Sequence, residues 1–246
     1  MTVHWVTGFL DTPAADAPVS ERFWPAVTGT SLSARRGDGA FATLVPPSGD
    51  ACLRVQVVGD APARGHLDLH VGDLAAETDR LVALGATVTG RADDVVVLRS
   101  PAGIVFCLVA WHGERTGPAA PVWPGRHRSL ADQLCLDIPG AGYAAEVGFW
   151  RAVTGWDHDP MPDCPEFERL FPPAPIPVRL LLQRLDGAGP AGVHVDLACS
   201  DVAAEVARHV ALGATVVREV PGDWTTLRDP AGREYCVTAR APGLAP

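Results

Sequence analysis

The sequence predicts an α+β protein that consists of two homologous domains, each built from two βαβββ modules. Three observations predict this class: an internal repeat, strand-like alternation followed by helix-like spacing within each repeat, and turns at glycine and proline between these elements. Hydrophobic residues make up 47% of the 246 residues and charged residues 20%, so the chain has enough apolar surface for packed cores.

The repeat is carried by segments that recur at a nearly constant spacing. Three pairs match, shifted by 126 (149 − 23), 128 (211 − 83) and 129 (230 − 101) residues: Phe23–Gly29 with Phe149–Gly155, Ala83–Val88 with Ala211–Val216, and Pro101–Gly103 with Pro230–Gly232. Because the shift grows by only three residues, the two units are equivalent and differ by small loop changes. We expect a domain over residues 1–112, a linker rich in Gly, Pro and Arg over 113–129, and a domain over 130–241.

The second half of the first repeat shows the module most clearly. Apolar and ionisable residues alternate over 66–71, which predicts a strand with one apolar face and one face that carries His66, Asp68 and His70. Asp73 stands at an N-cap position, helical spacing follows, and Gly85 supplies a C-terminal stop. Apolar runs at 95–98 and 104–109, separated by a Pro-Ala-Gly turn, predict further strands.

The first half of each repeat fits the same template. Leu10-Asp11-Thr12-Pro13 and Leu136-Asp137-Ile138-Pro139 predict strand ends in which the Asp caps a following helix. Those helices carry the Phe-Trp pairs, and residues 51–58 and 178–185 are expected to be closing strands.

Composition excludes several classes of function. The formal net charge is −9 and no basic run occurs, so neither a nucleic-acid partner nor an anionic membrane surface is expected. All twenty basic side chains are Arg, which rules out a Lys Schiff base and a P-loop. The start of the sequence lacks the basic and then apolar segments of a signal peptide, and no stretch is apolar and long enough to span a membrane. The six cysteines form no Cys-x-x-Cys pair. We therefore expect a cytoplasmic protein with reduced thiols.

Together, the paired modules, the Asp at the end of the first strand, the Phe-Trp pair in the first helix and Leu-Gly-Ala after the second helix resemble the vicinal-oxygen-chelate superfamily. This superfamily includes glyoxalase-like, bleomycin-resistance and dioxygenase-like proteins, and the closest likeness is to tandem actinobacterial forms. The resemblance implies that each pair of modules curls its mixed sheet into a cup, with the helices outside. It also implies a divalent metal in the cup, held by side chains on the first and last strands of the modules.

Mapped by position, the resemblance implies metal ligands in the first domain at His4, His66, Gln56 and Cys107. The usual carboxylate is absent, because its place falls on Cys107 here and on Cys236 in the second domain. A thiolate with imidazoles suits zinc better than iron, so a ring-cleaving dioxygenase is disfavoured. Two alternatives stay open: His4 as a solvated strand end, and the cysteines as core residues.

The sequence also contains candidate catalytic and substrate-binding residues. As catalytic groups the sequence offers two His-Asp pairs and one carboxylate: His66 with Asp68, His194 with Asp196, and Glu234. As substrate contacts it offers His70, Trp156, Trp224 and Gln183. Each has a structural alternative. The His-Asp pairs could be buried pairs that join the modules, Glu234 could be a surface carboxylate, and the other residues could serve in packing or lie at the surface.

Two functions follow from these residues. The first is an enzyme of the lyase or isomerase type, with or without a metal, that acts on a small organic molecule. The second is a non-catalytic protein that binds an antibiotic or another natural product. Because four modules are present in one chain, a monomer suffices for two cups, and a homodimer is the alternative.

Overall fold

A computed structural model of the chain describes residues 3–59, 61–187 and 189–243. The first repeat contains the elements β1 (Trp5–Pro13), α1 (Ala17–Thr28), β2 (Ser31–Leu32), β3 (Phe41–Val45), β4 (Leu53–Val58), β5 (Arg64–Val71), α2 (Leu74–Ala83), β6 (Thr87–Ala92), β7 (Val95–Arg99) and β8 (Val105–Ala110). The second repeat contains β9 (Ser129–Pro139), η1 (Gly140–Gly142), α3 (Tyr143–Thr154), β10 (Asp157–Pro160), β11 (Phe167–Phe171), β12 (Arg179–Leu185), β13 (Gly192–Cys199), α4 (Val202–Ala211), β14 (Thr215–Val220), β15 (Trp224–Arg228) and β16 (Glu234–Thr238).

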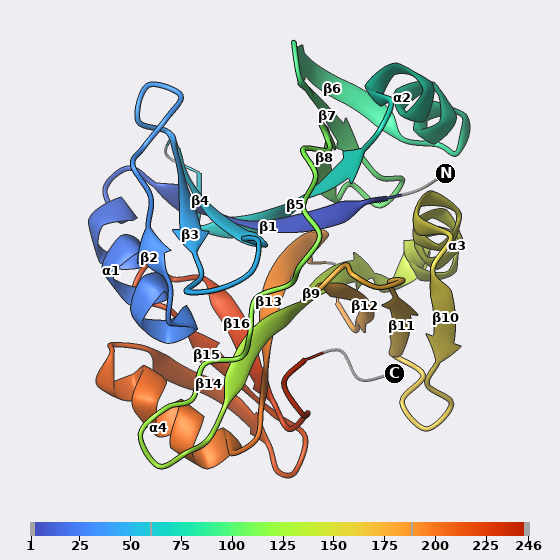
Figure 1. Cartoon of the computed structure of the whole chain (residues 1–246). Helices are drawn as coiled ribbons and strands as arrows, with labels where there is room; N and C mark the ends of the chain where they lie inside the picture. The colour runs from blue at the N-terminus through green and yellow to red at the C-terminus, as the bar shows by residue number, and fades with distance from the viewer. Residues whose placement is uncertain (1–2, 60, 188, 244–246) are drawn as a thin grey trace. The chain divides into compact units, whose positions relative to one another are not determined.

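The strands form two mixed eight-stranded sheets with the same order (Figure 1). One runs β2-β3-β4-β1-β5-β8-β7-β6 and the other β10-β11-β12-β9-β13-β16-β15-β14. Each contains a parallel pair, β5 with β8 and β13 with β16, flanked by antiparallel hairpins. The α+β class and the duplicated βαβββ pattern are therefore confirmed. No helix among the described residues is long and apolar enough to cross a membrane.

The helices of the second modules begin and end as predicted. The Asp73 side chain accepts a hydrogen bond from the backbone N–H of Ala76 at 3.0 Å, which is the N-cap geometry. Asp201 caps α4 in the same way through Ala204. Gly85 follows α2 with a φ of 107°, a left-handed conformation that favours glycine and ends the helix.

The helices of the first modules begin differently from the prediction. Asp11 and Asp137 were expected to cap them, but both lie within strands, β1 and β9. The N-cap of α1 is Asp16, whose side chain makes no capping bond, and the N-cap of α3 is Gly142 at the end of η1. Prediction of an N-cap at Asp11 and Asp137 was wrong because the strands continue to the following proline.

The chain divides into two compact units that cross the sequence repeat. Unit 1 takes in the residues up to Gly8 together with His66–Thr116 and Leu134–Val193. Unit 2 takes in Phe9–Gly65, Gly117–Gln133 and the chain from His194 onward. Each unit thus combines a first module of one repeat with the second module of the other. The domain boundaries drawn from the repeat, at residues 112 and 130, stay a prediction.

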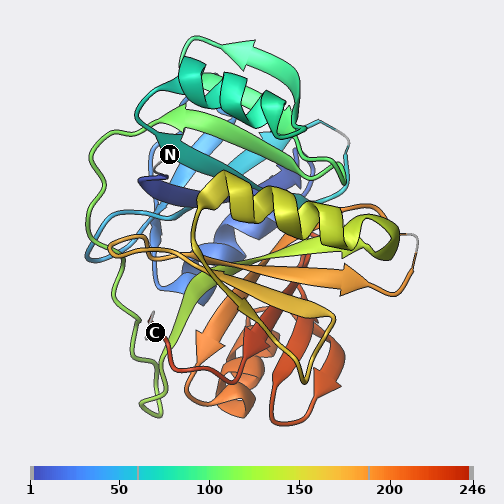
Figure 2. The ribbon, with the colours of Figure 1, turned by 90° about the vertical axis from the view of Figure 1, so that its right-hand side faces the viewer.

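The core of unit 1 is formed between α3 and β8. The ring of Trp150 packs edge-on against Phe106, with 5.1 Å between the ring centroids, and Phe149 also contacts Phe106. The buried Glu146 carboxylate accepts hydrogen bonds from the Trp150 indole and from the backbone N–H of Ala102, both at 2.8 Å. On its other side α3 lies beside β12 (Figure 2), where the Tyr143 hydroxyl donates to the Leu182 carbonyl.

The core of unit 2 is formed in the same way between α1, β16 and α4. Trp24 packs against Tyr235, with 5.1 Å between the ring centroids. The helices α1 and α4 lie side by side (Figure 1), because Arg208 donates to the backbone carbonyls of Ala26 and Val27 at the end of α1. The Phe-Trp pair of each repeat is therefore a packing feature.

Candidate functional site

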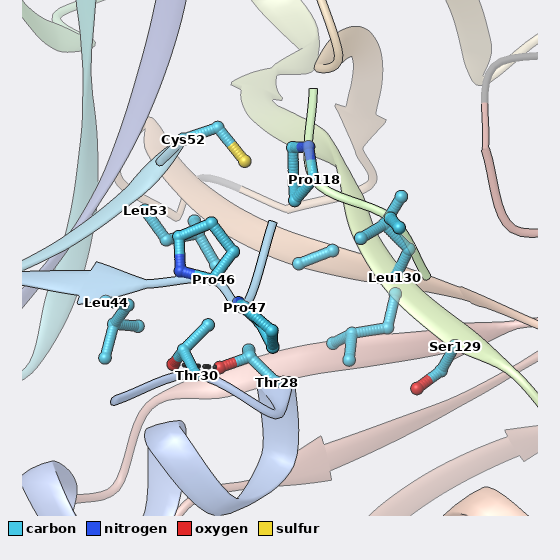
Figure 3. A pocket seen from close by; sticks show the side chains of 13 residues that line it. Thr28, Thr30, Leu44, Pro46, Pro47, Cys52, Leu53, Pro118, Ser129 and Leu130 are labelled. Carbon is cyan, nitrogen blue, oxygen red and sulfur yellow. Dashed lines mark hydrogen bonds between the residues drawn. The ribbon is translucent and has the colours of Figure 1, made fainter. Parts of the chain in front are cut away.

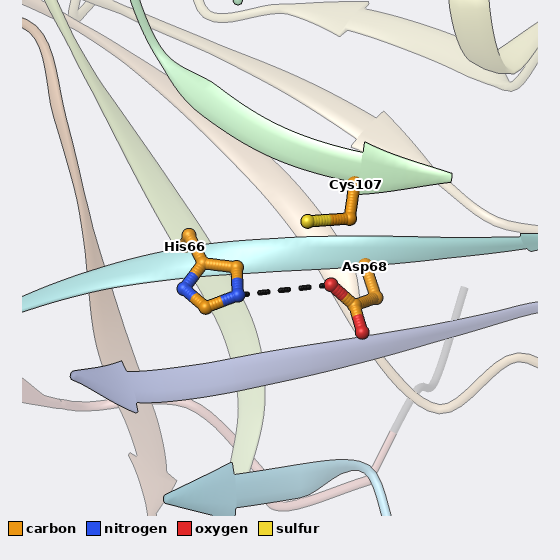
Figure 4. A group of neighbouring side chains, drawn as sticks. All are labelled: His66, Asp68 and Cys107. Carbon is orange, nitrogen blue, oxygen red and sulfur yellow. Dashed lines mark ion pairs between the residues drawn. The ribbon is translucent and has the colours of Figure 1, made fainter. Parts of the chain in front are cut away.

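Three side chains with metal-ligating atoms converge in unit 1 (Figure 4). His66 and Asp68 point to one face of β5, because residues two apart on a strand share a face, and His66 Nε2 lies 3.7 Å from Asp68 Oδ1. Cys107 lies directly opposite Asp68 on the parallel strand β8. One ligand atom from each of the three side chains lies within 4.8 Å of the others, and all three residues are buried.

His70 continues the same face of β5 but is held within the protein. Its Nε2 lies 2.9 Å from the Thr7 hydroxyl, and its Nδ1 lies 3.6 Å from the Glu114 carboxylate. The residue is only 1% exposed. The geometry makes His70 a link between β1, β5 and the segment that follows β8, and its role as a substrate contact stays a prediction.

The structure does not bring His4 into the cluster. Its backbone N–H donates to the His70 carbonyl, and its ring stacks on Trp111 with 4.4 Å between the centroids. Its position beside His70 is four residues along β5 from His66, which corresponds to about 13 Å of strand. Gln56 belongs to unit 2, where it lies opposite Phe41 on β3 and is half-buried.

Unit 2 contains a related but different cluster. His194 Nε2 lies 3.3 Å from Asp196 Oδ1 and 3.8 Å from the Cys236 sulfur, and Cys236 lies opposite Asp196 on β16. The Gln133 amide donates to Asp196 Oδ2. Burial raises the pKa of Cys236, and the nearby Asp196 carboxylate raises it further, so this thiol is protonated at neutral pH.

Gln133 is a site residue that sequence reasoning missed. At the shift of 126 residues it corresponds to Thr7, so the first strand of each repeat places a polar side chain at this level. In unit 2 the amide donates a hydrogen bond to one oxygen of Asp196, whereas in unit 1 the shorter Thr7 hydroxyl contacts His70. An alignment of the first strands of the two repeats places Gln133 opposite Thr7. Because Thr and Gln differ in size and chemistry, this match alone does not indicate a shared role.

The remaining predicted residues of unit 2 lie outside its cluster. Glu234 pairs with Arg228 at 2.7 Å, and both side chains are 49% exposed. It shares a strand face with Cys236 by alternation, but it lies at the start of β16, where the carboxylate turns to solvent. Trp224 is half-buried at the start of β15, with the Arg218 guanidinium 5.8 Å from its ring centroid.

Two predicted substrate contacts belong to unit 1. Trp156 follows α3 and is buried, with 7% of its surface exposed. Gln183 lies half-buried on β12, where its side-chain oxygen accepts a hydrogen bond from the Cys135 thiol at 3.4 Å. Gln183 is the more exposed of the two, and both residues stay predicted contacts.

An apolar pocket is present in unit 2 (Figure 3). Thirteen residues line it: Thr28, Thr30, Leu44, Pro46, Pro47, Cys52, Leu53, Pro118, Ala119, Ser129, Leu130, Ala131 and Leu197. Leu197 and Asp196 are consecutive on β13, so their side chains point to opposite faces and the pocket does not share the face of the His194–Asp196 pair. Leu130, the position that corresponds to His4 in the repeat, lines this pocket.

The donor set of the unit 1 cluster fits a divalent cation. Zinc–nitrogen and zinc–oxygen bonds are about 2.0–2.2 Å and zinc–sulfur bonds about 2.3 Å, which places tetrahedral ligand atoms about 3.3–3.8 Å apart. The atoms of His66, Asp68 and Cys107, which lie within 4.8 Å of one another, reach such spacings by side-chain movements of about 1 Å. A carboxylate and a thiolate would also balance the two positive charges.

Comparisons with known proteins agree with this architecture. The glyoxalase-like domain family matches residues 8–109 and 133–238. No curated protein matches the chain closely enough to count as a relative. Similar solved structures include BphC, a halotolerant catechol dioxygenase, with 16% identity and a TM-score of 0.64 over 100% of this chain and 89% of that one.

Two further solved structures are similar to the same extent. The 2,2',3-trihydroxybiphenyl 1,2-dioxygenase from Sphingomonas wittichii is 16% identical, with a TM-score of 0.65 over 97% of this chain and 90% of that one. The Mn(II)-bound glyoxalase from Novosphingobium aromaticivorans is 16% identical, with a TM-score of 0.66 over 97% and 82%. At this identity these likenesses show the fold alone. With both repeats matched by the family, the chain belongs to the glyoxalase-like domain family and, as the resemblance predicted, to the vicinal-oxygen-chelate superfamily.

Proposed function

We propose that the chain is a metal-assisted enzyme of the lyase or isomerase type in which His66, Asp68 and Cys107 hold a zinc ion. One observation carries this proposal: three buried ligands of different chemistry, from two adjacent strands, have donor atoms within 4.8 Å of one another. Catalytic zinc sites use three protein ligands and leave a fourth position for water or substrate. The substrate we expect is a small organic molecule with adjacent oxygen atoms.

The ligand chemistry favours zinc over iron. Non-haem iron oxygenases use two imidazoles and one carboxylate, whereas this cluster has one imidazole, one carboxylate and one thiol. Thiolate is a preferred ligand of zinc. When bound, zinc would polarise a substrate carbonyl and lower the pKa of a bound water. A manganese-bound glyoxalase is among the similar folds, so the metal analysis should measure manganese as well as zinc, and manganese in place of zinc would contradict the choice of ion.

The chain's own residues suit proton transfer beside such an ion. A lyase or isomerase acting on a carbonyl compound moves a proton between carbon and a base. Asp68, whose Oδ1 lies 3.7 Å from His66 Nε2, would hold the imidazole in place beside the ion. The neighbouring Leu67 and Leu69 are fully buried and anchor β5, so the face that carries these groups is rigid.

Metal analysis tests the proposal. We expect about one equivalent of zinc in protein purified without chelator, and its loss in both His66→Ala and Cys107→Ala. Cys164→Ala is the matched thiol control, because Cys164 lies on β10–β11 connecting residues outside the cluster and should leave the zinc in place. Protein that takes up no divalent cation, or that keeps it in both cluster variants, would exclude this function.

The alternative is a non-catalytic protein that binds a small apolar molecule, and the pocket in Figure 3 favours it. The lining is apolar except for a few hydroxyls and Cys52, and burial raises the pKa of that thiol to about 12, so it stays neutral. A Leu44→Trp substitution would fill the pocket. An apolar compound that raises the Tm of the wild type but not of this variant, and that is not consumed, would support binding over catalysis.

The setting of the protein is also a proposal. We infer a cytoplasmic protein that acts on small molecules, without a nucleic-acid or membrane partner, as a monomer or a homodimer. Sedimentation equilibrium distinguishes the last two states directly.

A further inference from the structure

Unit 2 has a second polar face, on the strands β3 and β4, that neither the metal cluster nor the apolar pocket uses. On one side of these strands the side chains are buried, among them Leu44 and Val55. On the other side Thr43 lies directly opposite Arg54, and Phe41 lies directly opposite Gln56. Directly opposite residues of an antiparallel pair share a face, so these four side chains form one surface, and all four are half-buried.

Arg54 is the charged group at the centre of this surface. Its guanidinium carbon lies 5.9 Å from the centroid of the Phe9 ring, and Phe9 packs edge-on against Phe41. Its Nε is buried, and among the described residues the side chain has neither a hydrogen-bond acceptor nor a carboxylate partner. A guanidinium carries five N–H donors in a planar fork, so this arrangement leaves strong donors unused beside an aromatic floor.

Arg36 brings a second positive charge to the same place. Its guanidinium donates to the hydroxyl of Thr43, the residue opposite Arg54, at 3.1 Å. Its backbone pairs with Phe41 across a tight turn, in which Gly37 has a φ of 59° and approaches the Phe41 ring so closely that a Cβ would lie 2.7 Å from it. Burial, and then the positive charge of Arg54, lower the pKa of Arg36.

Two comparable arginines, one beside Arg36 in sequence and one on the equivalent strand of unit 1, do have carboxylate partners. Arg35, the residue before Arg36, forms an ion pair with Glu21. In unit 1 the corresponding strand carries Arg169 at the position of Thr43, and Arg169 pairs with Asp159 at 2.7 Å. In both of these cases a carboxylate accompanies the guanidinium. Arg36 and Arg54 repel each other instead, which costs stability unless an anion binds between them.

We propose that Arg36, Arg54 and Thr43 form a binding site for an organic oxyanion, a carboxylate or phosphate carried on an aromatic body. Arg54 binds the oxyanion through its N–H fork, and Arg36 supplies the second charge. Phe41, which is half-buried, offers the ring contact that an aromatic body needs, and the buried Phe9 packs edge-on against it. Gln56 offers an amide at the edge. The site lies wholly in unit 2 and does not depend on the metal cluster of unit 1.

Binding of benzoate, phenyl phosphate and uncharged benzyl alcohol, followed by calorimetry or by NMR titration, tests this site. We expect one or both anions to bind in the millimolar range or better and benzyl alcohol to bind at least about tenfold more weakly, because charge-assisted hydrogen bonds supply most of the affinity. The stronger anion identifies the source of the oxyanion. Rising salt concentration should weaken binding.

Variants assign the effect to the two arginines. Arg54→Ala should weaken anion binding by about tenfold or more, and Arg36→Ala, at an exposed position, by about threefold to tenfold. Arg35→Ala is the matched control and should leave affinity unchanged. The proposal is overturned if the wild type binds neither anion, if benzyl alcohol binds as well as the anions, or if Arg35→Ala has the same effect as Arg36→Ala. Should Arg54→Ala fold poorly, Arg54→Gln and Arg36→Ala decide the outcome.

Discussion

Replacement of Asp229 by Ala should be among the most damaging single changes in unit 2. The Asp229 carboxylate forms a buried ion pair with Arg233 at 2.8 Å, and both side chains are at most 2% exposed. It also accepts hydrogen bonds from the Trp24 indole at 2.9 Å and from the backbone N–H groups of Ala231 and Arg233. Loss of one partner of a buried pair costs about 3–5 kcal/mol, because the other charge stays buried. Because the substitution also leaves the indole N–H of Trp24 without its acceptor, we expect the free energy of unfolding to fall by about 5 kcal/mol, the upper end of this range.

A surface pair at the two ends of the same turn provides the control. Arg228 and Glu234 are 2.7 Å apart, close to the 2.8 Å of the buried pair, but both are half exposed, so Glu234→Ala should cost about 0–1 kcal/mol. Urea unfolding followed by circular dichroism measures both, and the double variant Asp229→Ala with Arg233→Met should recover part of the loss. Equal costs for Asp229→Ala and Glu234→Ala would refute the argument that burial decides the strength of these pairs.

Three further substitutions test other parts of the structure. Glu146→Ala removes the acceptor of two buried donors in unit 1 and should lower the free energy of unfolding by about 2–4 kcal/mol in the same urea assay. Burial lowers the pKa of His209 from its ordinary 6.5, so the unfolded chain takes up a proton that the folded chain does not, and stability falls as the pH drops below about 6.5. His209→Gln should remove that part of the pH dependence, and an unchanged slope would contradict the assignment. Gly37→Ala should cost about 1–3 kcal/mol, through strain at positive φ and collision with Phe41, whereas Gly39→Ala, with open space around it, should cost only the strain.

The fold was predictable wherever local signals agreed with the tertiary structure. Around α2, the capping Asp73, the helical spacing and Gly85 all indicate the same helix, and the structure has it there. Around Asp11 the local signal and the tertiary structure disagree. An Asp-Thr-Pro sequence is typical of a helix start, but sheet pairing extends β1 through Pro13. Tertiary pairing overrode the local signal there, and no pattern within the segment reports it.

The candidate site was predictable only where chemistry repeats. His66 with Asp68 and His194 with Asp196 stood out because both repeats carry them. Other features depend on strands that lie far apart in the sequence and were not predictable. These are the contrast between Gln133 and Thr7 and the lack of a carboxylate beside Arg54. Glu234 shows the converse, since alternation correctly gives its strand face but does not indicate that the strand end lies in solvent.

The carboxylates that accept from the indoles of Trp24 and Trp150 show why such partners are hard to predict from sequence. Trp24 and Trp150 correspond in the repeat, and each donates its indole N–H to a buried carboxylate. In unit 2 this is Asp229, in the turn before β16, but in unit 1 it is Glu146, one turn earlier on the same helix as Trp150. Ser100 occupies the position in the first repeat that Asp229 occupies in the second. The acceptor of the indole hydrogen bond therefore lies on a different element in each unit, although both buried indoles require an acceptor.

The crossed composition of the units predicts how a single repeat behaves alone. In a fragment of residues 1–112, Trp24 loses Tyr235 and Asp229, and Phe106 loses Phe149 and Trp150. Two copies of the fragment can replace these partners, because the first module of each copy can pack on the second module of the other. We therefore expect the fragment to form a homodimer or to aggregate, and sedimentation equilibrium will report which. A stable, folded monomer of 1–112 would mean that each repeat packs its own two modules together, and would contradict the crossed arrangement of the cores.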